Sequence, residues 1–190
     1  MVGIALVLLV AFAGCGARPI AAPASANLSD WTTLRAEHRA TVEAAGESRR
    51  LRGLVAVARP DRLRLRAFGP GGLTLFDLIY RHGETTVLSA LLGRADEKLQ
   101  PILRGLGSDL AGLYNLQPQP AGRTVVPQNG HLLLRDSERT IELSEFRTIA
   151  GRAIPTRIQI DHPALAYRVT IEVVDVTLDS LLDPALFTPP

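Results

Sequence analysis

Apolar and polar residues alternate with a period of two along much of the chain. The clearest example is residues 62–66, where Leu63 and Leu65 are flanked by arginines, so an extended chain has one apolar and one charged face. This alternation is typical of a half-buried strand in an antiparallel sheet. Comparable runs predict strands over 54–58, 73–80, 85–91, 132–135, 140–146, 156–160 and 167–178. In the last run the apolar positions change phase near Val173, which predicts a β-bulge.

Two other segments show helical spacing. The first helix is expected to begin near Ser29, whose hydroxyl can cap the first turn, and to end at Gly46, with an apolar stripe formed by Trp31, Leu34, Val42 and Ala45. Residues 96–116 carry leucines and an isoleucine at spacings of three and four. Three glycines weaken this second helix and predict two short pieces rather than one: Gly105, Gly107 and Gly112.

Short turns join neighbouring strands. Pro60-Asp61 is expected to form one of them and Gly69-Pro70-Gly71-Gly72 another. The resulting order is helix, meander, helical insertion, meander. It predicts an α+β domain in which one strongly curved antiparallel sheet, a half-open β-barrel, has helices covering its concave face; a closed barrel is the alternative.

The chain begins with an uncharged apolar run, Val2–Gly14, directly followed by Cys15. Its 13 residues are too few to span a bilayer, which takes roughly 18 or more, but they suit a secretory signal. The small residues before Cys15 resemble the lipobox of bacterial lipoproteins, with Phe12 where that motif usually has leucine. The resemblance implies that residues 1–14 are a signal peptide and that Cys15 is acylated, with chains such as palmitate. An ordinary cysteine after a signal cut elsewhere is the alternative.

Acylation would place the protein at a membrane surface. A single acyl chain binds a bilayer reversibly, whereas several hold stably at about 0.8 kcal/mol per buried methylene. Residues 15–28 then form the lipidated cysteine and a flexible tether rich in small residues and proline, and 29–190 form the folded domain. Gly16 is not the aspartate that resembles an inner-membrane retention signal, so an outer-membrane location facing the periplasm is expected.

Composition excludes several classes of protein. The 21 basic and 19 acidic residues nearly balance and are interleaved, which gives no support for nucleic-acid binding. Because Cys15 is the only cysteine, the 175 residues after it contain no disulfide and must be stabilised by packing. That length suits one domain with a sizeable core.

No arrangement of residues indicates catalysis, a metal or a cofactor. The four histidines lie in four different predicted elements, without ligand spacing, and are expected at the surface: His38, His82, His131 and His162. No nucleophile elbow, His-Glu-x-x-His pair or Cys-x-x-Cys pair occurs. Asp77 stands out because it lies in an apolar strand, where it is either paired with an arginine or at the rim of an apolar face. We therefore expect a protein that is not an enzyme.

One stretch of the chain resembles a known family. Residues 63–72, Leu-Arg-Leu-Arg-Ala-Phe-Gly-Pro-Gly-Gly, followed by an apolar strand and a short turn, are similar to the lipoprotein receptor LolB and its relative, the periplasmic carrier LolA. Residues 173–179 and the ending 186–190 are similar to the last strand and tail of LolA-like proteins. The resemblance implies a half-open β-barrel closed by helices, with an apolar cavity for acyl chains. LolB-like receptors carry a membrane-contacting loop leucine; Gly71 occupies that position, and Leu73 is the candidate substitute.

The sequence thus suggests a function in lipid or lipoprotein localisation or transfer. The candidate cavity residues are the inward-facing aliphatic side chains of the strands, namely Leu63, Leu65, Leu75, Ile79, Leu143, Ile158, Ile160, Val169 and Ile171. The expected partners are the membrane, an acyl chain of a lipid or lipoprotein, and a periplasmic carrier that delivers it. The alternative is a structural or assembly lipoprotein that docks another envelope protein and holds no lipid.

Overall fold

A computed structural model describes residues 21–22, 30–44, 46–90, 96–117 and 123–189. The predicted signal peptide, Cys15 and most of the tether lie outside these residues. Within the described part of the chain, no helix combines the length and the apolar character needed to cross a bilayer.

Ten strands form one antiparallel sheet in the order β5-β4-β3-β2-β1-β10-β9-β8-β7-β6. The strands of the first half are β1 (Thr33–Ala44), β2 (Glu47–Ala58), β3 (Arg62–Phe68), β4 (Thr74–Arg81) and β5 (Glu84–Ala90). Those of the second half are β6 (Thr124–Gln128), β7 (His131–Arg135), β8 (Thr140–Ile149), β9 (Arg152–His162) and β10 (Tyr167–Leu178). One α-helix, α1 (Asp96–Leu113), and three 3-10 turns, η1 (Pro70–Gly72), η3 (Pro163–Leu165) and η4 (Pro184–Phe187), complete the described elements.

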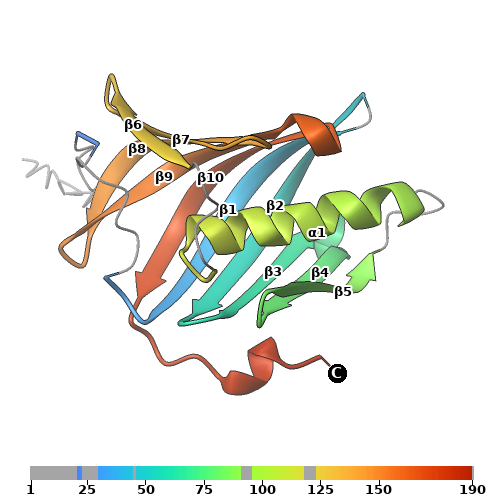
Figure 1. Ribbon diagram of the computed structural model, residues 1–190. Coiled ribbons are helices and arrows are strands. Elements are labelled where there is room, and N and C mark those ends of the chain that lie inside the picture. The colour runs from blue at the N-terminus through green and yellow to red at the C-terminus, as the bar shows by residue number, and fades with distance from the viewer. Residues whose placement is uncertain (1–20, 23–29, 45, 91–95, 118–122, 190) are drawn as a thin grey trace, which may run out of the picture.

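The sheet consists of two meanders that meet where β1 pairs with β10. The edge strands β5 and β6 are not paired with each other, so the barrel is open rather than closed. Helix α1 connects these two edges in sequence and lies across one face of the sheet, here called the concave face (Figure 1). The predicted antiparallel sheet is confirmed, whereas the expected set of covering helices is a single α-helix in the described residues.

The helix predicted from Ser29 to Gly46 is wrong, because residues 33–44 form the central strand β1. Its side chains alternate between buried and exposed from Leu34 to Ala40. The inward positions after Leu34 are Ala36, His38 and Ala40, which are small or polar. An alternation without large apolar residues is hard to distinguish from a helical stripe, since alanine also favours helices.

The second predicted helix lies where the sequence placed it, but it is not divided into two short pieces, because α1 is one helix of 18 residues. Its glycines allow close contacts rather than a break. A Cβ on Gly107 would lie 2.5 Å from Thr85 Cγ2 of β5, and one on Gly105 would lie 2.3 Å from Leu165 Cδ1 of η3. Alanine at 107 would push α1 away from β5, whereas alanine at 105 would require the Leu165 side chain to move.

The predicted bulge in the last strand is confirmed. Glu37 pairs with Asp175 and the next residue, His38, pairs with Val173, so Val174 is the extra residue of β10. The turn at Pro60-Asp61 and the hairpin turn at 69–72 are also confirmed. Strand β6 was not predicted; all five of its side chains are exposed, so it has no period-two signal.

Asp77 is paired with two arginines on the face of the sheet opposite α1. Its Oδ2 atom lies 2.6 Å from Arg64 Nη2 and 2.9 Å from Arg66 Nε. Burial alone would raise the pKa of the Asp77 carboxyl, but hydrogen bonds and charge from both arginines hold it below its usual range. Arg64 also donates to the carbonyl of Leu186, which attaches η4 to β3 on this face. The first of the two sequence alternatives, pairing with arginine, is therefore correct.

We expect Asp77→Ala to lower the free energy of unfolding by about 2–3 kcal/mol, because charged hydrogen bonds are lost and Arg64 stays partly buried without its acid. The measurement is urea unfolding at pH 7. Asp175→Ala is the matched control, since Asp175 is exposed, and should change stability by less than about 0.5 kcal/mol. Equal effects of the two substitutions would contradict this account of Asp77.

Candidate functional site

The space between α1 and the concave face contains a small, mostly apolar cavity. Its walls come from β1, β2, β3 and β10 on the sheet side, and from Leu106, Leu110 and Tyr114 on the helix side. Its volume is about 30 Å³. Typical ligand pockets measure about 300–1,000 Å³, far more than the space left with α1 in this position, which is here called the closed state. A long acyl chain fits here only if α1 moves away from the sheet.

A second cavity of about 20 Å³ adjoins the first, and Tyr114 lines both. The Tyr114 ring contacts Trp31 edge-on, with ring centroids 5.9 Å apart. The guanidinium of Arg59 lies 4.5 Å from the Trp31 ring centroid and donates to the Tyr114 carbonyl over 2.7 Å. Burial raises the pKa of Tyr114 to about 12, so its hydroxyl is neutral at pH 7. Tyr114 is thus held in place between the two cavities.

His38 is the polar exception in the wall of the first cavity. It projects from the middle of β1 and is 7% exposed. Neither of its ring nitrogens has a hydrogen-bond partner among the described residues. Burial lowers its pKa from 6.5 to about 4, so the imidazole is neutral at pH 7.

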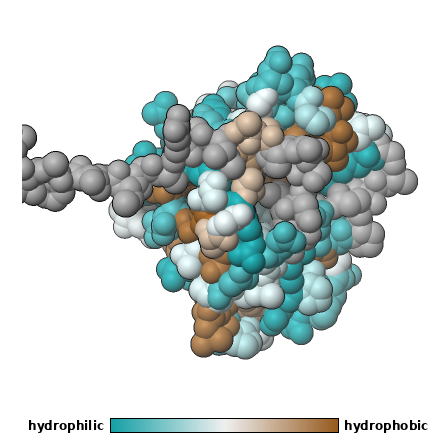
Figure 2. Space-filling view, turned by 90° about the vertical axis from the view of Figure 1, so that its left-hand side faces the viewer, coloured by the Kyte–Doolittle hydropathy of each residue, from teal (hydrophilic) through white to brown (hydrophobic). Residues whose placement is uncertain are grey.

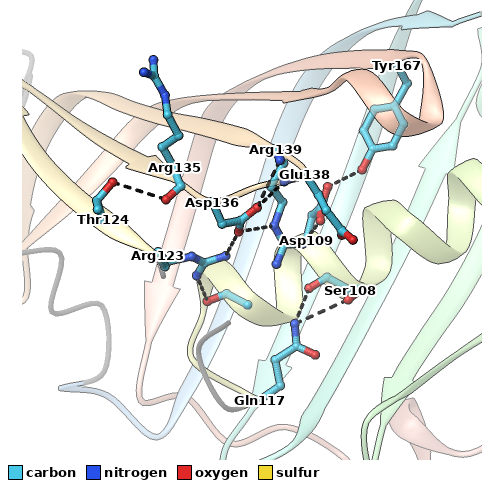
Figure 3. Close-up of polar contacts among 11 residues, drawn as sticks. Ser108, Asp109, Gln117, Arg123, Thr124, Arg135, Asp136, Glu138, Arg139 and Tyr167 are labelled. Carbon is cyan, nitrogen blue, oxygen red and sulfur yellow. Dashed lines mark hydrogen bonds and ion pairs between the residues drawn. The ribbon is translucent and has the colours of Figure 1, made fainter. Parts of the chain in front are cut away.

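A buried polar cluster attaches α1 to the second half of the sheet (Figure 3). Asp109 of α1 accepts hydrogen bonds from Arg139, in the β7–β8 turn, and from the hydroxyl of Tyr167 on β10. Arg139 Nε also donates to Asp136 Oδ2 over 3.1 Å, and Arg123 Nη2 lies 3.4 Å from the same oxygen. Burial raises the pKa of Tyr167, which keeps its hydroxyl protonated as a donor. The cluster fixes the position of α1 because its members have few alternative partners in the core.

A second set of hydrogen bonds links the end of α1 to the first half of the sheet. The Tyr80 hydroxyl donates to Gln117 Oε1 over 3.1 Å, and Gln117 Nε2 donates to the Ser108 carbonyl over 2.9 Å. The helix is therefore attached to strands on both sides of the β1–β10 pair.

The structure places the nine predicted cavity residues in several different environments. Leu65, Val169 and Ile171 line the first cavity, and Ile158 lines the second. Three others are fully buried in the surrounding core: Leu63, Leu143 and Ile160. Leu75 is only partly buried, at an irregularity in the β3–β4 pairing, and Ile79 pairs with Arg64 on the face opposite α1. Whether any of them contacts a lipid stays a prediction.

Leu73 directly follows η1 and is 57% exposed. It is one of five large apolar residues that are exposed in the described chain, together with Val125, Val126, Val174 and Leu181. On the face shown in Figure 2, apolar residues form small separate groups among hydrophilic ones. The large cluster of buried apolar residues includes Leu103, Leu106 and Leu110 of α1.

The surface position expected for all four histidines is wrong for two of them. His38 and His162 are buried, whereas His82 and His131 are exposed and lie beside Asp61 and Glu142, respectively. No group of three or more histidine, cysteine, aspartate or glutamate residues in the described ranges could hold a metal ion.

Sequence reasoning missed several residues of this site. His38 and Ala36 were assigned to a helix, and Tyr114 was not singled out. The available signal was the alternation of Leu34, Ala36, His38 and Ala40 with charged residues.

A family model matches residues 35–175, which is most of the domain that encloses the cavity. The chain belongs to the DUF3261 family, described as proteins of unknown function. A search of curated proteins finds no match.

Solved structures share the fold of this DUF3261 protein. A DUF1329 family protein from Desulfovibrio piger has a TM-score of 0.56 at 9% identity, covering 85% of this chain and 91% of that one. A LolA superfamily protein from Nitrosomonas europaea has a TM-score of 0.54 at 10% identity, covering 86% and 93%. A putative outer membrane lipoprotein-sorting protein domain from Vibrio parahaemolyticus has a TM-score of 0.52 at 11% identity, covering 84% and 91%. The LolA-like fold expected from the sequence is confirmed.

The burial of His38 predicts that stability depends on pH. Its folded pKa of about 4 lies below the unfolded value of 6.5, so protons bind preferentially to the unfolded chain between these values. We expect the unfolding free energy to fall by roughly 3 kcal/mol as the pH drops from 6.5 to 4. Urea unfolding at several pH values measures this. His38→Leu should remove most of the slope; an unchanged slope would contradict the assignment.

Proposed function

We propose that this protein is a membrane-anchored envelope lipoprotein that binds an acyl chain, from a lipid or a lipoprotein, between α1 and the concave face. The observation that carries the proposal is the pair of adjoining, mostly apolar cavities under a single helix, in a sheet with the LolA-like fold. The protein would act in lipoprotein or lipid localisation or transfer at the outer membrane, without covalent chemistry.

Binding would follow from transfer of apolar surface. Each Å² of lipid surface removed from water contributes about 25 cal/mol. In the closed state α1 itself covers the concave face, so an acyl chain must replace part of the helix contacts made by Leu106 and Leu110. This exchange of one apolar contact for another would allow lipid to be taken up and released without a large net change in free energy.

The anchor and the cavity would act together. Acylated Cys15 would hold the domain at the outer membrane, facing the periplasm, with the residues up to 28 as a tether. A periplasmic carrier would then deliver the acyl chain, and Leu73, exposed beside η1, would contact the membrane during transfer.

A second candidate function is a structural or assembly lipoprotein that docks a protein partner and carries no lipid. The observation that favours it is the edge strand β6, whose five side chains are all exposed and include Val125 and Val126. An unpaired edge of this kind can accept a strand from another protein.

The cavity can be tested with a matched pair of valine substitutions. Val42 lines the cavity and is only partly buried, so Val42→Phe should block it; Val174 is 52% exposed at the bulge of β10 and lies outside the cavity walls. Native mass spectrometry of the full chain purified in detergent should show co-purifying lipid in the wild type and in Val174→Phe. In Val42→Phe the bound fraction should fall about tenfold, given an overpacking penalty of about 1–3 kcal/mol.

Absence of lipid from the wild type, even after incubation with acyl lipids, would contradict the carrier function and favour the docking function. Equal lipid content in both variants would show that any bound lipid lies elsewhere.

The anchor is tested by Cys15→Ala. We expect the protein to leave the membrane fraction or to stay unprocessed, because no acyl chains are attached. Fractionation and intact-mass measurement of the isolated protein report both effects. Unchanged membrane attachment, together with a mass that differs from the wild type only by the sulfur atom of Cys15, would rule out acylation at this residue.

A further inference from the structure

His38 is a buried polar side chain in an otherwise apolar wall. The other described side chains that line the first cavity are alanine, valine, leucine and isoleucine, apart from Tyr114. No described residue donates to or accepts from the His38 ring. Its nitrogens are also not among the fully buried atoms that lack a partner, so they reach the open space of the cavity.

The fold makes room for this imidazole. Gly53 lies directly across from His38 on β2, and a Cβ at Gly53 would lie 2.2 Å from His38 Nε2. Any larger residue at 53 would displace the ring. A glycine in the interior of a strand weakens the strand and often marks a close approach, so this pair is a specific arrangement for holding the ring in place.

The neighbouring polar groups cannot satisfy His38. On the helix side, Asp109 is already hydrogen bonded to Arg139 and Tyr167. From the segment after α1, Tyr114 is the titratable group in the cavity wall, and its hydroxyl is neutral. From β2 and β10, the residues that pair with His38 are Gly53 and Val173, which carry no charge. A partner for the imidazole must therefore lie in the cavity itself, as a water molecule, for which about 30 Å³ is enough room, or as a polar group of a ligand that replaces it.

We propose that His38 is a ligand-contact residue whose ring N–H donates a hydrogen bond to the carbonyl oxygen of a bound acyl group. The inference rests on the proposed acyl-chain binding and specifies its chemistry, because a plain alkyl chain offers no acceptor. A neutral imidazole has one N–H donor, which a carboxyl, ester or amide carbonyl can accept.

The position of His38 also sets a direction for the ligand. Toward one end of β1 the wall continues to Leu34 and Trp31, both 3% exposed, and to the second cavity. Toward the other end it reaches Val42, which is partly exposed. With the carbonyl at His38, the alkyl tail lies toward Trp31 and the rest of the molecule leaves past Val42.

The test compares three ligands of similar length by native mass spectrometry of the full chain in detergent: palmitic acid, methyl palmitate and hexadecane. The wild type should bind at least one carbonyl ligand more tightly than hexadecane. His38→Leu should weaken binding of that ligand about tenfold, as expected for one hydrogen bond, and leave hexadecane unchanged. His38→Gln, which retains an N–H donor, should keep most of the preference. Binding of palmitic acid alone would identify the ligand as a free fatty acid. Binding of methyl palmitate as well would identify it as an esterified or amide-linked acyl chain.

Two results would overturn the role of His38 and leave acyl binding intact: no preference for carbonyl ligands in the wild type, or equal preference in His38→Leu. Failure of all three ligands to bind the wild type would instead overturn the proposed function. Spectra of the wild type with ¹⁵N-labelled histidine provide a measurement that needs no variant. Adding the bound carbonyl ligand should shift the ring-nitrogen signals of one of the four histidines, whereas unchanged signals from all four would contradict the contact.

Discussion

An open sheet with an apolar concave face requires a cover, and α1 supplies it. The sheet has two unpaired edges, β5 and β6, and the helix that joins them in sequence lies over the face between them. The size of the interior cavities depends on how closely this helix approaches the concave face. Gly105 and Gly107 permit close contact with Leu165 and Thr85, and the cavities that remain are too small for a lipid.

Two kinds of interaction hold α1 against the sheet, and they differ in specificity. Leucines of α1 contact the aliphatic side chains of the sheet, and apolar contacts of this kind are not directional. The cluster of Asp109, Arg139 and Tyr167 is specific, because each buried polar group needs a partner of the right geometry. The apolar contacts therefore provide most of the free energy, and the polar cluster sets the position of the helix.

Much of the fold was predictable from the sequence where large apolar residues alternate with charges. Leu63 and Leu65 between arginines identify β3 at once, and the change of phase after Val173 locates the bulge. The prediction failed at β1, because a buried strand is usually marked by large apolar residues. The inward residues here are the small Ala36 and Ala40 and the polar His38. It failed again in α1, since Gly105 and Gly107 weaken an isolated helix but are required by neighbours that are distant in sequence. His38 was missed for the same reason, as its environment is created by Gly53, Val173 and α1 together.

The pairing of β1 with β10 affects how the protein can fold after it is made. The backbone N–H of Thr32 donates to Asp179 Oδ1 over 2.7 Å across a separation of 147 residues, and β1 pairs with β10 along its length. The centre of the sheet therefore cannot form until nearly all of the chain is available. Long-range pairing of this kind makes folding slow. The topology itself therefore delays completion of the sheet until the last strand, β10, is available to pair with β1.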